Sequence, residues 1–88
     1  ATNSFAEQCH QVLLNLQLIL QAGGSGLDRV LKVTIYMKNL TQFGELNEIY
    51  AEYFDASKPA RACVEVSDLP KGVDIEMDAI AEISPAID

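Results

Sequence analysis

Basic residues, histidine and cysteine are all scarce in this chain of 88 residues. Six Lys and Arg stand against thirteen Asp and Glu, so the formal net charge is −7. A general nucleic-acid binder needs basic side chains to displace counterions from phosphates, so this balance argues against one. His10 is the only histidine, and Cys9 and Cys63 lie far apart in the sequence, which excludes the usual zinc-ligand spacing and a disulfide framework. We therefore expect no metal, and a reduced, intracellular compartment.

Long apolar runs are also missing. No stretch approaches the roughly 20 apolar residues that span a bilayer, and no basic segment followed by an apolar one marks a signal peptide. Hydrophobic residues make up 49% of the chain and charged residues 22%, a globular balance that is too apolar for a disordered segment. We expect no membrane contact, and one small domain over residues 1–88 with a thin core.

Two segments have the apolar spacing of amphipathic helices. Ser4 and Glu7 fit a capping box at the start of the first, and the glycine-rich run 23–26 predicts its end. The second runs from about Thr41 to Phe54. An amide, Asn47, shares its apolar face with Phe43, Leu46, Tyr50, Tyr53 and Phe54.

Three segments alternate as strands do: Val30–Lys38, Ala60–Ser67 and about Val73–Ile83. The apolar face expected of the first consists of Leu31, Val33, Ile35 and Met37. We expect one polar sheet face to carry Arg61, Cys63, Glu65, Glu76 and Asp78, and another subunit to cover it. The order helix, strand, helix, strand, strand predicts a two-layer α+β sandwich, with two helices packed on one sheet.

Four residues could carry chemistry, and each has an ordinary alternative. The guanidinium of Arg61 suits bidentate binding of a carboxylate, but an ion pair with Glu65, Glu76 or Asp78 is slightly favoured. Cys63 has no histidine to activate it, so a pocket-lining thiol is expected. Glu76 could be a general base or position a water, or could be a solvated carboxylate. Asn47 is either a hydrogen-bonded core amide, the commoner case, or a pocket amide.

The order of several motifs resembles one family. Residues 59–66 (PARACVEV), 69–72 (LPKG) and 75–81 (IEMDAIA) closely resemble the signature of the RidA family of enamine/imine deaminases, also described as YjgF-type or liver perchloric-acid-soluble proteins. Residues 26–34 and 43–54 are similar to the middle section of the same family. The resemblance covers nearly the whole chain.

The resemblance implies a fold and an assembly. The fold would be chorismate-mutase-like, and the protein a homotrimer whose sheets form a central barrel, with ligand pockets between subunits. The family's usual N-terminal strands are missing, so we expect either a piece of a longer protein or a shortened relative. By the family pattern the last strand would lie between the first strand and an N-terminal one, so here it has an unpaired edge.

The resemblance also implies an activity. Arg61 would clamp the carboxylate of a 2-imino acid, and Glu76 would orient and activate the water that attacks the imine carbon. Cys63 and Asn47 would line the pocket. The products would be a 2-keto acid and ammonia, as for a 2-iminobutanoate/2-iminopropanoate deaminase, without metal or cofactor.

Other functions stay open. One is a trimer that binds small carboxylates without catalysis, another is RNA cleavage, which the net charge of −7 opposes, and a third is a structural or chaperone-like trimer. The compartment would be the cytoplasm or the mitochondrion.

Overall fold

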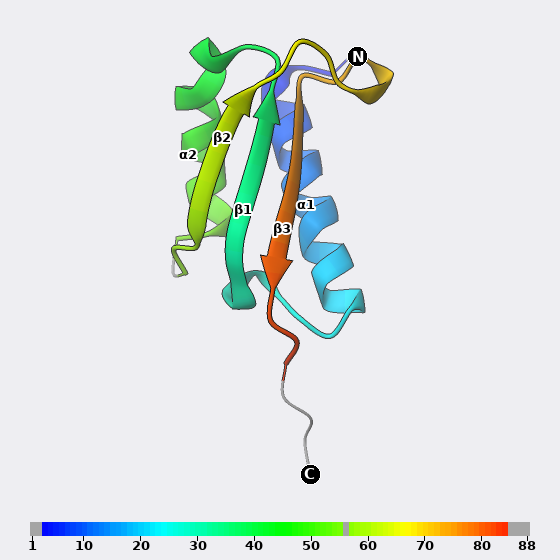
Figure 1. Ribbon diagram of the computed structural model, residues 1–88, viewed down its shortest axis with the longest axis vertical. Helices are drawn as coiled ribbons and strands as arrows, with labels where there is room; N and C mark the ends of the chain where they lie inside the picture. The colour runs from blue at the N-terminus through cyan, green and yellow to red at the C-terminus, as the bar shows by residue number, and fades with distance from the viewer. Residues whose placement is uncertain (1–2, 56, 85–88) are drawn as a thin grey trace.

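The computed structural model describes residues 3–55 and 57–84. The elements are α1 (Phe5–Ala22), β1 (Val30–Met37), α2 (Phe43–Tyr53), β2 (Ala60–Glu65) and β3 (Ile75–Ala81). Both helices lie behind one face of the three-stranded sheet (Figure 1). The predicted two-layer α+β sandwich is therefore confirmed. Within the described residues, neither helix is long and apolar enough to cross a bilayer.

The start of α1 is the predicted capping box. The Ser4 Oγ accepts from the Glu7 amide at 3.2 Å, and the Ser4 amide donates to the Glu7 carboxylate at 3.1 Å. At the other end, the Ser25 amide donates to the Leu20 carbonyl at 2.8 Å, and Gly24 has a φ of 82°. Glycine adopts this left-handed conformation without a steric penalty, so the glycine run ends the helix as expected.

The middle strand, β1, pairs in parallel with β2 and antiparallel with β3. The parallel pair is joined by the crossover through α2, as parallel strands require. The core lies between this sheet and the two helices. It consists of Phe5, Cys9, Leu13, Val30, Val33, Ile35, Met37, Leu46, Ile49, Tyr50, Phe54 and Ile75.

The prediction that Leu31 belongs to the apolar face was wrong. Leu31 is 52% exposed, whereas Val30 is only 6% exposed. The register explains the difference, because Val30 and Lys32 pair with the adjacent residues Ala81 and Ile80. Leu31 is thus the extra residue of a β-bulge, which breaks the strict alternation on which the prediction relied.

The prediction of one polar sheet face was also wrong. Paired residues on neighbouring strands share a face of the sheet. The register pairs Val33 with Arg61, Ile35 with Cys63, Met37 with Glu65, Tyr36 with Glu76 and Thr34 with Asp78. Arg61, Cys63 and Glu65 therefore lie on the helix side, and Glu76 and Asp78 on the open side. Alternation along β2 separates its two faces but does not say which one the helices cover. At this edge strand the long Arg61 side chain still reaches water.

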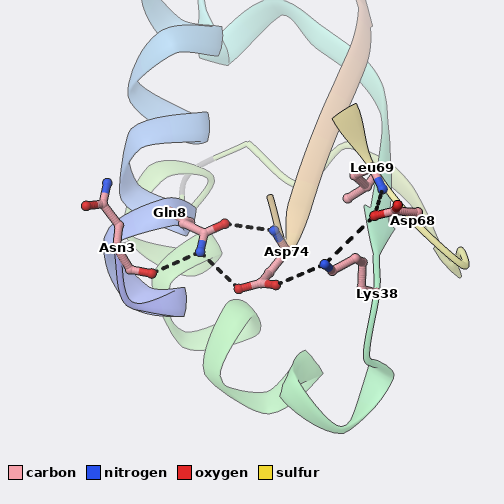
Figure 2. A network of polar contacts seen from close by, with 6 residues as sticks. All are labelled: Asn3, Gln8, Lys38, Asp68, Leu69 and Asp74. Atoms are coloured by element: carbon pink, nitrogen blue, oxygen red, sulfur yellow. Dashed lines mark hydrogen bonds and ion pairs between the residues drawn. The ribbon is translucent and has the colours of Figure 1, made fainter. Parts of the chain in front are cut away.

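A buried amide joins α1 to β3. Gln8 is 6% exposed, and its side chain accepts from the Asp74 amide at 2.8 Å and donates to the Asp74 carboxylate at 3.0 Å. The same carboxylate lies 3.7 Å from the ammonium of Lys38, which is 3.9 Å from Asp68 (Figure 2). These contacts connect the first turns of α1 to the start of β3 and the end of β1.

Candidate functional site

Arg61 is held at the start of β2 by three side chains of α2. Its Nη1 donates to the Oδ1 of Asn47 at 2.7 Å. Its guanidinium carbon lies 4.8 Å from the ring centre of Tyr50 and 5.2 Å from that of Phe43. A guanidinium at these distances is attracted by the ring faces. Helix α2 therefore orients the guanidinium from one side, and the remaining N–H donors of Arg61 are available to a ligand.

The ion pair that sequence reasoning slightly favoured for Arg61 does not form. Among the described residues, ion pairs involve only Lys38, with Asp68 and Asp74. The acids named as partners lie elsewhere: Glu76 and Asp78 are on the opposite face, and Glu65 accepts from the Leu40 amide at 3.0 Å. Arg61 is exposed, and no carboxylate of the described residues lies within ion-pair distance of its guanidinium.

A hollow of about 380 Å³ opens beside Arg61, between the C-terminal half of α2 and the segment that enters β2. This volume is in the range of small-molecule pockets. The residues around the hollow are Asn47, Tyr50, Ala51, Phe54, Asp55, Lys58, Pro59 and Arg61. Of the predicted site residues, the structure brings Arg61 and Asn47 together here.

Tyr50 lines this hollow, and its hydroxyl is buried. Among the described residues it has no hydrogen-bond partner. Burial raises the pKa of Tyr50, and the positive charge of Arg61 opposes that rise. The phenol therefore stays neutral at physiological pH and serves as a platform for the guanidinium.

Cys63 follows Arg61 on the same side of β2 and is half-buried. Its Sγ lies 3.5 Å from the sulfur of Met37. Burial raises the pKa of the Cys63 thiol, although the charge of Arg61 acts in the other direction. Since the thiolate is the nucleophilic form, this environment suits a packing thiol. Cys63 is not among the residues around the hollow beside Arg61, so its expected place in a pocket stays a prediction.

Glu76 lies apart from Arg61 within one chain. It is exposed on the open face of the sheet, opposite Tyr36, whose hydroxyl donates to Asp78 at 3.0 Å. That hydrogen bond is the main cause of the raised pKa of Tyr36. Two strand spacings, roughly 10 Å, and the thickness of the sheet separate β3 from Arg61. One chain therefore does not present Arg61 and Glu76 to the same small substrate.

In the part of the chain that the structure describes, metal-ligating residue types do not cluster, and the single histidine lies outside the hollow beside Arg61. Within residues 3–55 and 57–84, no three His, Cys, Asp or Glu side chains gather as a metal site would require. His10 is exposed, and its Nδ1 lies 3.1 Å from the hydroxyl of Tyr53. Both Cys9 and Cys63 are free thiols.

Sequence reasoning did not identify Lys58, or the contact of Arg61 with the rings of Phe43 and Tyr50. Phe43, Asn47 and Tyr50 follow one another at helical spacing, so the signal was present on the face of α2. The rings were expected only in the core, because nothing in the sequence indicated that β2 would bring Arg61 over them.

Comparison with known proteins shows the family. The model of the family described as Endoribonuclease L-PSP matches residues 1–83, and the chain belongs to this family, which includes the RidA proteins. Protein HMF1 of Saccharomyces cerevisiae is 50% identical over 78 residues, which are 89% of this chain and 60% of that protein. Protein MMF1, mitochondrial, from the same yeast is 42% identical over 78 residues, 89% of this chain and 54% of that one.

A rat relative carries a functional name. The 2-iminobutanoate/2-iminopropanoate deaminase of Rattus norvegicus is 45% identical over 80 residues, 91% of this chain and 58% of that protein. The chain thus spans about 60% of the length of the curated relatives it matches.

Solved structures confirm the fold. The crystal structure of the yeast protein YEO7 superposes with a TM-score of 0.92 at 46% identity, over 96% of this chain and 67% of that one. Escherichia coli TdcF with bound serine superposes with a TM-score of 0.88 at 35% identity, over 93% of this chain and 67% of that one.

Proposed function

We propose that the chain forms the carboxylate-binding part of a deaminase that hydrolyses 2-imino acids to 2-keto acids and ammonia. The observation that carries the proposal is the environment of the Arg61 guanidinium. Its guanidinium is fixed by Asn47 and two rings, has no carboxylate partner among the described residues, and borders an open hollow. The name of the rat relative and the serine bound to TdcF support a small α-carboxylate as its ligand.

The chemistry needs little beyond binding and proton transfer. With the carboxylate bound at Arg61, water adds to the electrophilic imine carbon and forms a carbinolamine. A proton moves to the nitrogen, the C–N bond breaks and ammonia leaves, while the oxygen becomes the carbonyl of the 2-keto acid. The imine supplies its own electron sink, so the proposed reaction uses no metal or cofactor.

Glu76 is the proposed general base, and in this proposal it comes from another copy of the chain. Within one chain it lies on the opposite face of the sheet from Arg61. A homotrimer with pockets at the subunit interfaces would bring the Arg61 of one copy to the Glu76 of the next. The small 2-imino acids would then bind between subunits, with Cys63 at the rim. The compartment, cytoplasm or mitochondrion, stays a prediction.

Imine hydrolysis tests the proposal directly. An amino-acid oxidase generates a 2-imino acid in situ, and semicarbazide traps what is not hydrolysed. We expect the protein to lower the trapped fraction and Arg61→Ala to abolish this effect. Arg29→Ala, which removes an arginine from the turn before β1, is the matched control and should retain activity. An active Arg61→Ala variant would refute the role of Arg61.

Binding without catalysis is the second candidate, because the fixed guanidinium and the hollow would serve it equally well. The variant Glu76→Gln separates the two functions. If it binds 2-oxobutanoate normally but no longer hydrolyses the imine, the deaminase is supported. If the wild-type protein binds 2-oxobutanoate but never lowers the trapped fraction, the non-catalytic function replaces it.

A further inference from the structure

The hollow beside Arg61 holds a second cation, Lys58. Two of the six basic residues of the chain thus line a single hollow, together with only one of its thirteen acids, Asp55. In a chain with a net charge of −7, this concentration of positive charge is local and opposite to the overall sign. Such a reversal attracts anions to the hollow.

Neither cation is neutralised by the protein. Among the described residues no carboxylate lies within ion-pair distance of Arg61 or Lys58, and Asp55 pairs with neither of them. Lys58 is exposed, and Pro59 favours an extended backbone at the residue before it. Its flexible side chain can therefore turn into the hollow, whereas Arg61 is fixed by its contacts to α2.

Part of the wall of the hollow is apolar. Tyr50, Phe54 and Pro59 contribute to the wall of the hollow, and Tyr50 and Phe54 are almost fully buried. A ligand that matches this arrangement has an anionic group at each end and a short aliphatic segment between them. The volume of about 380 Å³ leaves room for more than a substrate with one carboxylate and a methyl or ethyl group.

We propose that Lys58 is a specificity-determining residue that favours dicarboxylic 2-imino and 2-oxo acids. Arg61 binds the α-carboxylate and Lys58 binds the carboxylate at the end of the side chain. This inference rests on the proposed function, since it assigns the α-carboxylate to Arg61.

Ligand titration tests the inference without any catalytic step. The dissociation constants of 2-oxoglutarate and 2-oxobutanoate are measured by calorimetry or NMR at low ionic strength. We expect 2-oxoglutarate to bind about two- to fivefold more tightly, the factor that one exposed ion pair supplies when it contributes about 0.5–1 kcal/mol. Lys58→Gln should abolish this preference by lowering the affinity for 2-oxoglutarate more than that for 2-oxobutanoate, while Lys58→Arg should retain it. The preference should also shrink as salt is added.

The control variant is Lys71→Gln, which removes the same charge from the connection between β2 and β3, beyond the far end of β2. It should keep the preference for 2-oxoglutarate. Equal affinity for the two ligands in the wild-type protein, or a preference that survives in Lys58→Gln, would overturn the role of Lys58 alone. If neither ligand binds to the folded protein, the carboxylate site at Arg61 fails, and the proposed function fails with it.

Discussion

Replacing Gln8 with alanine should destabilise the protein far more than the same change one helical turn later. The side chain of Gln8 makes three hydrogen bonds, at 2.8 Å to the Asp74 amide, 3.0 Å to the Asp74 carboxylate and 3.0 Å to the Asn3 carbonyl (Figure 2). Gln8 is 6% exposed, so its own amide is shielded from water, whereas Asp74 is half-buried and Asn3 is exposed. Because each such hydrogen bond contributes about 1 kcal/mol net, and water replaces part of what is lost at half-buried Asp74, we expect a loss of about 2 kcal/mol.

Urea unfolding measures this loss. A domain of this size changes its free energy of unfolding by about 1 kcal/mol per molar urea, so the midpoint of Gln8→Ala should fall by about 2 M. Gln11→Ala is the matched control, since Gln11 is exposed and its side chain donates only to Asn15, at 2.7 Å. Its midpoint should move by less than about 0.5 M. Equal midpoints for the two variants would refute the stabilising role of the Gln8 contacts.

Three further outcomes follow from the burial of single groups. Tyr50→Phe removes a buried hydroxyl without a partner among the described residues, so stability in urea should stay the same or rise by up to about 1 kcal/mol; a loss would show that the hydroxyl is bonded. At pH 8 a thiol reagent should modify Cys63 before Cys9, since burial raises the pKa of Cys9 to about 12; Cys9 reacting first would contradict this. Val30→Ala should lower the free energy of unfolding by about 2 kcal/mol, and Leu31→Ala by less than about 0.5 kcal/mol. A larger loss in Leu31→Ala than in Val30→Ala would refute the bulge.

The pKa of Cys9 also predicts how stability depends on pH. The folded thiol titrates near 12, against an ordinary value of 9.0, so the folded state retains a proton that the unfolded chain releases. The contribution of Cys9 to stability is therefore complete below pH 9 and decreases as the pH rises from 9 towards 12. In urea titrations at pH 8 and pH 10, Cys9→Ala should lose less stability between the two values than the wild-type protein; an equal loss would refute this origin.

The local features of the fold were predictable from the sequence. Ser4 and Glu7 identify the start of α1, and the glycine run identifies its end, because both depend on residues that are neighbours in the chain. The strand periods were also correct, except at Leu31, where a bulge interrupts the alternation of β1. The short 3-10 turn at Leu40–Gln42, which delays the start of α2 to Phe43, was missed, since its residues fit a helix equally well.

The arrangement of the site was only partly predictable. The sequence identified Arg61 and Asn47, but not that they would contact each other, because their pairing depends on how α2 lies against β2. The separation of Arg61 from Glu76 depends on the register of three strands. A period of two assigns residues to opposite faces, yet it contains no information about which face the helices cover.

The acidic residues of β3 have a consequence for how copies of this chain can meet. Within the described residues, no strand pairs with the outer edge of β3. Two such edges could join antiparallel into one continuous sheet, but Glu76 and Asp78 would then lie among the same acids of the other copy. Like charges in facing positions destabilise such a pair. The exposed edge therefore resists this edge-to-edge pairing at low ionic strength, and concentrated salt, which screens charges beyond about 3 Å, removes this protection.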